Sequence, residues 1–227
     1  HSIGSRLLRQ YAAALGLAAG FSVLDRGDAA DLLDLLRHQL GYSRLARRFP
    51  RKDTCLAIYS SRVNSGRGLD EVLASSFPWC AEWEAQLRAL FGAYVERKQA
   101  NGALDYDDLL LYWHALVEDP ALARRIGDAF DHVLVDEYQD TNALQGRILA
   151  ALKPDGAGVT VVGDDAQAIY SFRAATVDNI LEFPRRYAPP AAVVTLEENY
   201  RSCQPVLDAA NALIAAGGRQ HRKTLRA

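Results

Sequence analysis

The chain lacks methionine entirely and contains only three cysteines in 227 residues, namely Cys55, Cys80 and Cys203. The cysteines are far apart and form no C-x-x-C pair, which excludes the usual zinc spacing and a disulfide framework of the secreted type. We therefore expect reduced, structural thiols in an intracellular protein. Because a native reading frame begins with methionine, the start at His1 predicts an internal segment of a longer product.

Long apolar runs are also missing. None is long enough to span a membrane, and no signal-peptide pattern opens the chain, so we expect a cytoplasmic protein without a membrane partner. The net charge is small, −2 from 26 basic and 28 acidic residues. A balance of this kind neither indicates nor excludes binding to nucleic acid.

The charges are unevenly distributed. Between Arg37 and Arg67 eight basic residues accompany one acid, Asp53, whereas ten acids and two arginines lie between Asp105 and Asp140. This asymmetry predicts a basic surface in the first half and a cation or metal-phosphate site in the second. The alternative for the basic run is an ordinary solvated helical face.

Apolar residues make up 49% of the chain, enough for a sizeable core. In the first hundred residues they recur at helical spacing, which predicts helices over residues 1–17, 29–40, 53–64, 69–74 and 79–99. Asp28 and Asp53 are the expected N-caps of the second and third of these helices. The last helix carries an apolar stripe that we expect in the core rather than on a binding surface: Trp83, Leu87, Leu90, Phe91 and Tyr94.

Beyond residue 100 the pattern changes. Helices are predicted to begin at Asp105 and at Pro120. Short β-branched runs at residues 133–135, 159–162 and 193–196 then alternate with helical stretches at 143–152, 176–187 and 205–216, with Pro184 as a kink. Strands that alternate with helices predict βαβ units, and hence an α/β fold with a parallel sheet flanked by helices.

Three of these strands end in polar residues. The first stretch, residues 132–140, reads HVLVDEYQD, so a buried strand is followed directly by Asp136 and Glu137. In an open α/β sheet, ligands bind outside the carboxyl ends of the strands. One carboxylate there suits Mg²⁺ and the other suits an attacking water, although a solvated strand end is the alternative.

The second stretch, residues 161–173, reads VVGDDAQAIYSFR. The amide of Gln167 is able to donate to and accept from a phosphate or its attacking water. Tyr170 and Phe172 lie beside Arg173, and flat rings with a cation are typical of a stacking platform for unpaired bases. The alternative is that both rings belong to the core.

The third stretch, residues 195–202, reads TLEENYRS and places Arg201 just after the predicted strand. An arginine at that edge of the sheet reaches a terminal phosphate and stabilises charge as it transfers. The alternative is a surface arginine paired with Glu197 or Glu198.

Together the three stretches resemble helicase motifs II, III and IV of superfamily 1, in its UvrD/Rep branch. The three stretches match, in order, the family boxes D-E-x-Q-D, G-D-x-x-Q-x-I-Y-x-[WF]-R-G-A and E-N-Y-R-S. Two further segments are similar to family sequences. His1-Ser2 resembles the end of T-F-H-S, and residues 105–110 resemble D-[FY]-D-D-L-L. The resemblance covers nearly the whole chain. It implies an incomplete P-loop NTPase (RecA-like) sheet, with residues 1–16 and 101–227 in motor domain 1A and residues 17–100 in an all-helical 1B subdomain.

The resemblance also implies roles for single residues. Asp136 and Glu137 would hold Mg²⁺ at ATP, and Glu137 would be the general base for hydrolysis. Gln167 would sense the γ-phosphate, and Arg201 would contact it as an arginine finger. The residues implied to contact DNA are His1, Tyr170, Phe172 and Arg173.

The chain departs from the family pattern in three places. The phosphate-binding loop G-x-x-x-x-G-K-[ST] is absent, and its nearest match, residues 217–224, has Arg222 where the second glycine must lie. No counterpart of a second motor domain is present. Ala174 stands where the third box has glycine.

The sequence therefore predicts a fragment of an ATP-dependent DNA helicase that translocates 3′ to 5′ on single-stranded DNA and unwinds duplex DNA in repair or replication. The fragment itself is expected to be inactive as an ATPase. Repair or replication proteins are further expected partners. Two alternatives remain, a non-catalytic DNA-binding or regulatory module derived from a helicase, and the motor of a helicase-nuclease.

Overall fold

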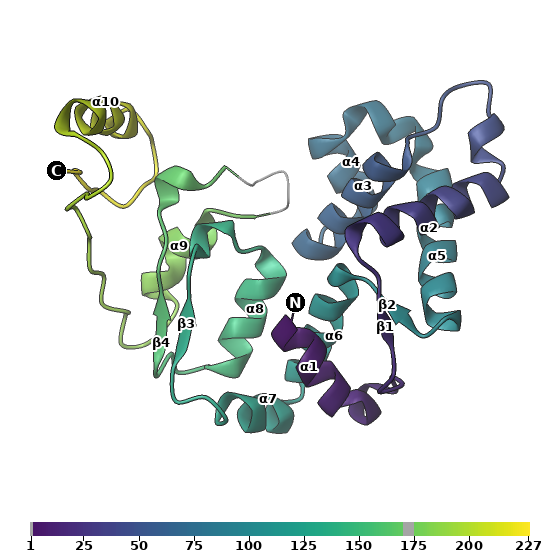
Figure 1. Cartoon of the computed structure of the whole chain (residues 1–227), viewed down its shortest axis with the longest axis horizontal. Helices are drawn as coiled ribbons and strands as arrows, with labels where there is room; N and C mark the ends of the chain where they lie inside the picture. The colour runs from purple at the N-terminus through teal and green to yellow at the C-terminus, as the bar shows by residue number, and fades with distance from the viewer. Residues whose placement is uncertain (1, 170–174) are drawn as a thin grey trace. The chain divides into compact units, whose positions relative to one another are not determined.

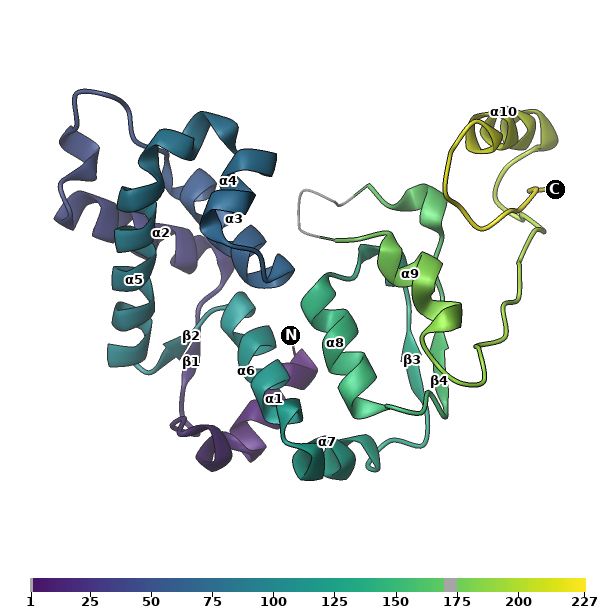
Figure 2. The same cartoon turned by 180° about the vertical axis from the view of Figure 1, so that it is seen from behind.

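The computed structural model describes residues 2–169 and 175–227, and Figures 1 and 2 show the course of the chain. The described residues divide into two compact units. The first unit contains residues 2–129 and 142–152, and the second contains residues 130–141, 153–169 and 175–227. The chain is mostly helical, with short parallel sheets.

Four helices of the first unit share one core: α2 (Arg26–Gln39), α3 (Lys52–Ser65), α4 (Leu69–Ser76) and α5 (Glu84–Ala100). Leu33, Ile58 and Leu87 are fully buried in it. Burial of each such side chain contributes about 1.5–3 kcal/mol. The predicted stripe on α5 is confirmed as core, with Trp83 packed at its edge.

The predicted helix starts are partly wrong. Asp25, and not Asp28, is the N-cap of α2: its carboxylate accepts from the N–H of Asp28 at 2.9 Å, and Asp28 accepts from the N–H of Asp25. This reciprocal pair extends the helix by one turn. Helix α3 begins after Arg51 without a side-chain cap, so Asp53 lies within its first turn. The 3₁₀ helix η3 (Pro78–Trp83) precedes α5.

The remaining helices of the first unit surround a second core. They are α1 (Ser2–Gln10), α6 (Tyr106–Glu118), α7 (Pro120–Gly127) and α8 (Ala143–Leu152). The 3₁₀ turn η1 (Ala12–Leu15) packs against this second core, and η2 (Tyr42–Arg44) packs against the first. The prediction of an all-helical first hundred residues missed β1 (Ser22–Val23), which pairs in parallel with β2 (Ala103–Leu104). Two-residue strands are too short to produce a sequence period.

The second unit is built on two strands. β3 (Val133–Val135) pairs in parallel with β4 (Val159–Val161), as Figures 1 and 2 both show. The helix predicted over residues 176–187 is shorter than expected: α9 (Asp178–Glu182) gives way to the 3₁₀ turn η7 (Phe183–Arg185). Pro184 has no N–H to continue α9. The unit also contains η4 (Tyr138–Asp140), η5 (Asp165–Gln167) and α10 (Gln204–Ala215).

The third predicted strand is wrong. Residues 193–196 form no strand, and Val193, Val194 and Leu196 are 58%, 80% and 77% exposed. A strand needs a neighbour for its backbone hydrogen bonds. Among residues 2–169 and 175–227, no strand lies beside this segment. Within the same part of the chain, no helix is both long and apolar enough to cross a membrane.

Candidate functional site

The carboxyl ends of β3 and β4 meet in the second unit. The N–H of Val162 donates to the carbonyl of Val135 at 2.8 Å, and the N–H of Tyr138 donates to the carbonyl of Val162 at 2.9 Å. These bonds bring the residues after β3, Asp136 and Glu137, next to the loop after β4, which begins at Val162. Two of the three predicted stretches therefore converge on one edge of the sheet, as the α/β pattern requires.

Glu137 has an unusual backbone. It is the one non-glycine residue with positive φ in the described part of the chain, at φ 49° and ψ 44°. A left-handed conformation costs a non-glycine residue on the order of 1–3 kcal/mol and persists only where its surroundings fix it. Its N–H donates to Asp136 Oδ1 at 2.9 Å. The two carboxylates are thus held in a defined turn at the strand end.

Gln139 joins the two loops. Its side-chain Nε2 donates to Glu137 Oε2 at 2.7 Å, and its Oε1 accepts from the N–H of Asp164 at 3.0 Å. The side chain is only 2% exposed. The residue patterns alone predicted no role for Gln139, although it occupies the Q of the D-E-x-Q-D box. Its place inside that box was the available signal.

Gly163 allows this contact. A Cβ at this position would lie 2.5 Å from Gln139 Oε1 and 3.1 Å from the backbone N of Tyr138. Any larger residue would displace the Gln139 amide. The glycine of the second stretch is therefore required by the close approach of the two loops.

The loop after β4 is organised by Asp164. Its carboxylate accepts from the N–H of Ala166 at 3.0 Å and from Gln167 Nε2 at 2.9 Å, and it forms an ion pair with Lys223. Burial alone raises the pKa of Asp164, but the hydrogen bonds from Lys223 and Gln167 outweigh burial and leave this pKa below its ordinary value. Gln167 is therefore held by a charged carboxylate.

Arg201, the third predicted catalytic residue, lies in a turn after residues 197–199. Its N–H donates to Asn199 Oδ1 at 2.9 Å. No contact between its guanidinium and the Asp136–Glu137 pair is present among the described residues. The neighbouring Tyr200 hydroxyl donates to Glu198 at 2.8 Å, so Glu198 pairs with Tyr200 rather than with Arg201. Four further predicted site residues, His1, Tyr170, Phe172 and Arg173, lie outside the described residues.

The described residues contain no group of three or more His, Cys, Asp or Glu side chains that would hold a metal ion. A Mg²⁺ site needs fewer protein ligands than such a group provides, because Mg²⁺ is commonly bound through one or two carboxylates together with water and phosphate oxygens. Asp136 and Glu137 are both exposed carboxylates on one tight turn. This pair of hard oxygen donors therefore fits Mg²⁺.

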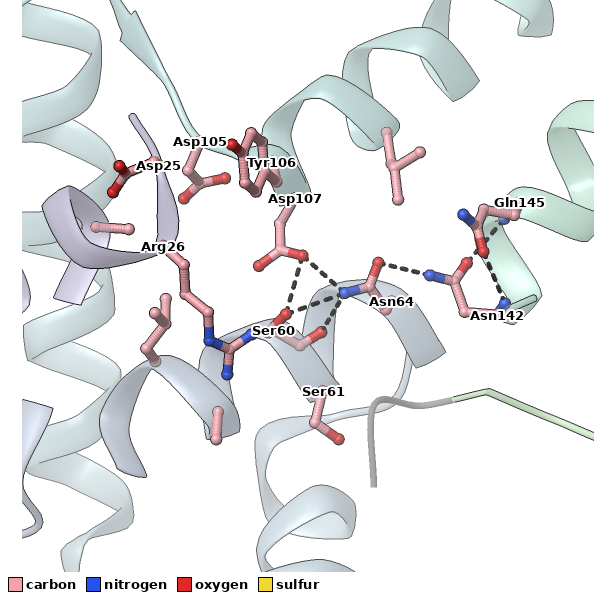
Figure 3. Close-up of a pocket in the computed structure, with 14 residues that line it drawn as sticks. Asp25, Arg26, Ser60, Ser61, Asn64, Asp105, Tyr106, Asp107, Asn142 and Gln145 are labelled. Atoms are coloured by element: carbon pink, nitrogen blue, oxygen red, sulfur yellow. Dashed lines mark hydrogen bonds between the residues drawn. The ribbon is translucent and has the colours of Figure 1, made fainter. Parts of the chain in front are cut away.

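A polar cavity of about 460 Å³ lies in the first unit, among α2, α3, α6 and α8. Figure 3 shows Asp107 directed towards Ser60 and Asn64, with Asn142 completing the chain of amides. Asp107 Oδ1 accepts from Asn64 at 2.7 Å, and Asn64 Oδ1 accepts from Asn142 at 2.9 Å. Burial raises the pKa of Asp107, while the bonds from Asn64 and Ser60 oppose that shift. Arg26 and Tyr106 line the same cavity.

The basic run between Arg37 and Arg67 is partly neutralised. Arg37 pairs with Asp34 at 2.7 Å, and the ammonium of Lys52 pairs with Asp31. Arg48 and Arg51 line a second cavity of about 460 Å³ that also contains Trp79. Part of the expected basic surface therefore remains without an ion pair among the described residues, including Arg48 and Arg51 beside this second cavity.

Comparison with known proteins identifies the family of the chain. The family model described as "UvrD/REP helicase N-terminal domain" matches residues 1–188. The "ATP-dependent DNA helicase UvrD1" of Mycobacterium tuberculosis is 37% identical over 98% of this chain and 30% of its own length. The "DNA helicase II" proteins of Haemophilus influenzae and Escherichia coli are each 33% identical, over 95% and 94% of this chain and 28% and 29% of their own lengths.

The chain thus spans about 30% of the length of these relatives. The family match and the convergence of the strand ends agree with the resemblance carried by the three motifs. This chain belongs to the UvrD/REP helicase family and covers its N-terminal domain region.

Proposed function

We propose that the chain is part of an ATP-dependent DNA helicase that moves 3′ to 5′ on single-stranded DNA and unwinds duplex DNA. In this proposal residues 1–16 and 101–227 belong to a RecA-like motor domain, and residues 17–100 form its helical 1B subdomain. The observation that carries the proposal is the bridge from Glu137 through Gln139 to Asp164. This bridge holds the carboxylate of Glu137, the proposed base, beside the loop that contains Gln167.

Each residue then has a task in ATP hydrolysis. Glu137 accepts the proton of the attacking water at its carboxylate, while the hydrogen bond from Gln139 fixes the orientation of that carboxylate. Gln167 orients the water and the terminal phosphate through its amide. Arg201 stabilises the charge that develops on the transferring phosphoryl group. Mg²⁺, held by Asp136 and Glu137, would neutralise phosphate charge.

For DNA we propose contacts from His1, Tyr170, Phe172 and Arg173, in keeping with the family resemblance. The polar cavity of the first unit supports this activity. It combines an aromatic ring, Tyr106, with the guanidinium of Arg26, two groups suited to stacking on unpaired bases.

The test is single-stranded-DNA-stimulated ATP hydrolysis by the longer protein that carries this segment. We expect Glu137→Gln to lower kcat by about 10²–10⁴-fold, because the general base is lost while the shape is kept. Glu71→Gln, an exposed change in α4, serves as the matched control and should retain activity. The 227-residue chain alone should show no hydrolysis, because it has no phosphate-binding loop.

Two results would contradict the proposal. Hydrolysis by the chain alone would show that the phosphate loop is dispensable. A longer protein that binds DNA but never hydrolyses ATP would favour the non-catalytic DNA-binding module instead.

A further inference from the structure

The last described segment of the chain, residues 219–226, runs along the second unit and is held at alternate residues. Arg219 pairs with Asp178 at 3.0 Å and with Glu182 at 3.5 Å. The N–H of His221 donates to Asp165 Oδ2 at 3.1 Å. Lys223 is the next anchor, so this segment, here named the strap, is fixed to α9 and then to the loop after β4.

Lys223 is a largely buried anchor of the strap. Its side chain is 10% exposed, and its ammonium pairs with Asp164 and with Asp165 Oδ1, the latter at 3.1 Å. Asp164 uses its other oxygen, Oδ2, to accept from Gln167 at 2.9 Å. One carboxylate is therefore shared between the strap and the residue proposed to sense the γ-phosphate.

The far end of the strap is tied to the segment that carries Arg201. The N–H of Arg226 donates to the carbonyl of Glu197 at 2.9 Å, and the N–H of Asn199 donates to the carbonyl of Arg226 at 2.7 Å. Asn199 in turn holds the N–H of Arg201 through its side chain at 2.9 Å. Only residues 224 and 225 separate the anchor on Asp164 from this pairing.

We propose that Lys223 is a positioning residue that holds Gln167 and Arg201 in register through the strap. The inference rests on the proposed function, because both residues are assigned there to the terminal phosphate. Without Lys223, the neighbouring carboxylates of Asp164 and Asp165 lose the cation that they share, so the loop after β4 rearranges and Gln167 loses its fixed acceptor. The strap also loses its contact with the loop after β4, so the position of Arg201 relative to Gln167 is no longer fixed.

The test uses the longer protein with Lys223→Met, Lys223→Arg and, as a matched control, Lys153→Met. Lys153 lies in the same unit and bonds only to the carbonyl of Phe130 among the described residues. The readout is kcat per nucleotide-binding site, with KM for ATP measured separately and binding sites counted by titration with a fluorescent ATP analogue. A merely structural role would reduce the number of sites but leave kcat per site unchanged.

We expect Lys223→Met to lower kcat per site by about tenfold, the scale of coupling between linked sites. Lys223→Arg should recover most of the loss because it restores the ion pairs, and Lys153→Met should match the wild type. Wild-type kcat per site in Lys223→Met, or an arginine variant no better than methionine, would overturn the inference. A wild-type protein without any hydrolysis would instead refute the proposed function itself.

A second readout uses the 227-residue chain and does not depend on ATP. Lys223→Met should raise the pKa of the Asp164 carboxyl, followed by NMR, because the bond from Lys223 is the largest influence that lowers it. An unchanged pKa would show that the two side chains do not pair, and the inference would fail.

Discussion

At the scale of single residues, the first unit contains a buried charge cluster with one cation and two anions. Lys98, 2% exposed, donates to Asp105 Oδ2 at 2.6 Å and to Asp108 Oδ2 at 2.5 Å. Tyr94 donates to the same oxygen of Asp105 at 2.7 Å. Burial and the charge of Asp105 raise the pKa of Asp108 to about 6, against the attraction of Lys98.

This cluster predicts a pH dependence of stability. From pH 4 to 6 the folded chain retains a proton on Asp108 that the unfolded chain, with a pKa of 3.8, has released. The contribution of Asp108 to the free energy of unfolding is therefore full at low pH and is lost as pH rises through this window, by roughly 3 kcal/mol. We expect Asp108→Asn to flatten that part of the stability curve in urea unfolding at a series of pH values.

The other groups that interact electrostatically with Asp108 are Asp105, Lys98, Tyr59 and Tyr94, and all remain in the variant. Asp131→Asn, an exposed change, is the matched control and should leave the curve unaltered. A curve for Asp108→Asn with the wild-type slope between pH 4 and 6 would show that Asp108 titrates normally.

The site shows what residue patterns alone predict. Asp136 and Glu137 were found because they follow a β-branched run, and Gln167 because it lies in a specific box. Gln139 and Lys223 were not, because their contacts with Asp164 join residues 25 and 59 positions apart. The D-E-x-Q-D box marks Gln139 but does not show its contact with Asp164, and nothing local marks Lys223. Both contacts arise only when the strand ends and the strap are brought together.

At the scale of elements, periodicity predicted the long helices and the strands β3 and β4 but failed where the outcome depends on a neighbour. Residues 193–196 have the β-branched composition of a strand, yet no strand pairs with them in the described part of the chain. The start of α2 was misplaced because Asp25 and Asp28 are both suitable caps, and only the reciprocal bonds select Asp25. The composition of a segment favours a strand, but whether the strand forms depends on its contacts with neighbouring segments.

The surroundings of two glycines predict opposite effects on stability when each glycine is replaced by alanine. At Gly163 an added methyl group would lie 2.5 Å from Gln139 Oε1 and 2.8 Å from Ile180 Cδ1, so Gly163→Ala should destabilise the chain by about 1–3 kcal/mol. Gly92 lies inside α5 with nothing within 4 Å of the added atom, so Gly92→Ala should stabilise the chain by about 0.5–1 kcal/mol. Chemical denaturation measures both. Equal shifts in the same direction would show that the loops after β3 and β4 are not in contact.

At the scale of the whole molecule, the two units differ in how well they cover their apolar residues. The first unit contains three buried clusters. The second unit exposes large apolar side chains along β3, the loop after β4 and the segment beyond α9: Leu134, Val162, Val193, Val194 and Leu196. Exposed apolar side chains that lie together are typical of a surface that associates with another. The chain spans about 30% of the length of these relatives.

This exposure predicts self-association of the 227-residue chain. Leu134, at the centre of β3, is 75% exposed, and it pairs in register with exposed Thr160. We expect the weight-average sedimentation coefficient to rise with concentration, and Leu134→Lys to reduce this rise because a charge disfavours contact between exposed strands. Gln10→Lys adds the same charge on α1 in the first unit and should leave the association as it is. If both lysine variants suppress association equally, net charge rather than the apolar face of β3 governs it; if neither does, the contact lies elsewhere in the chain.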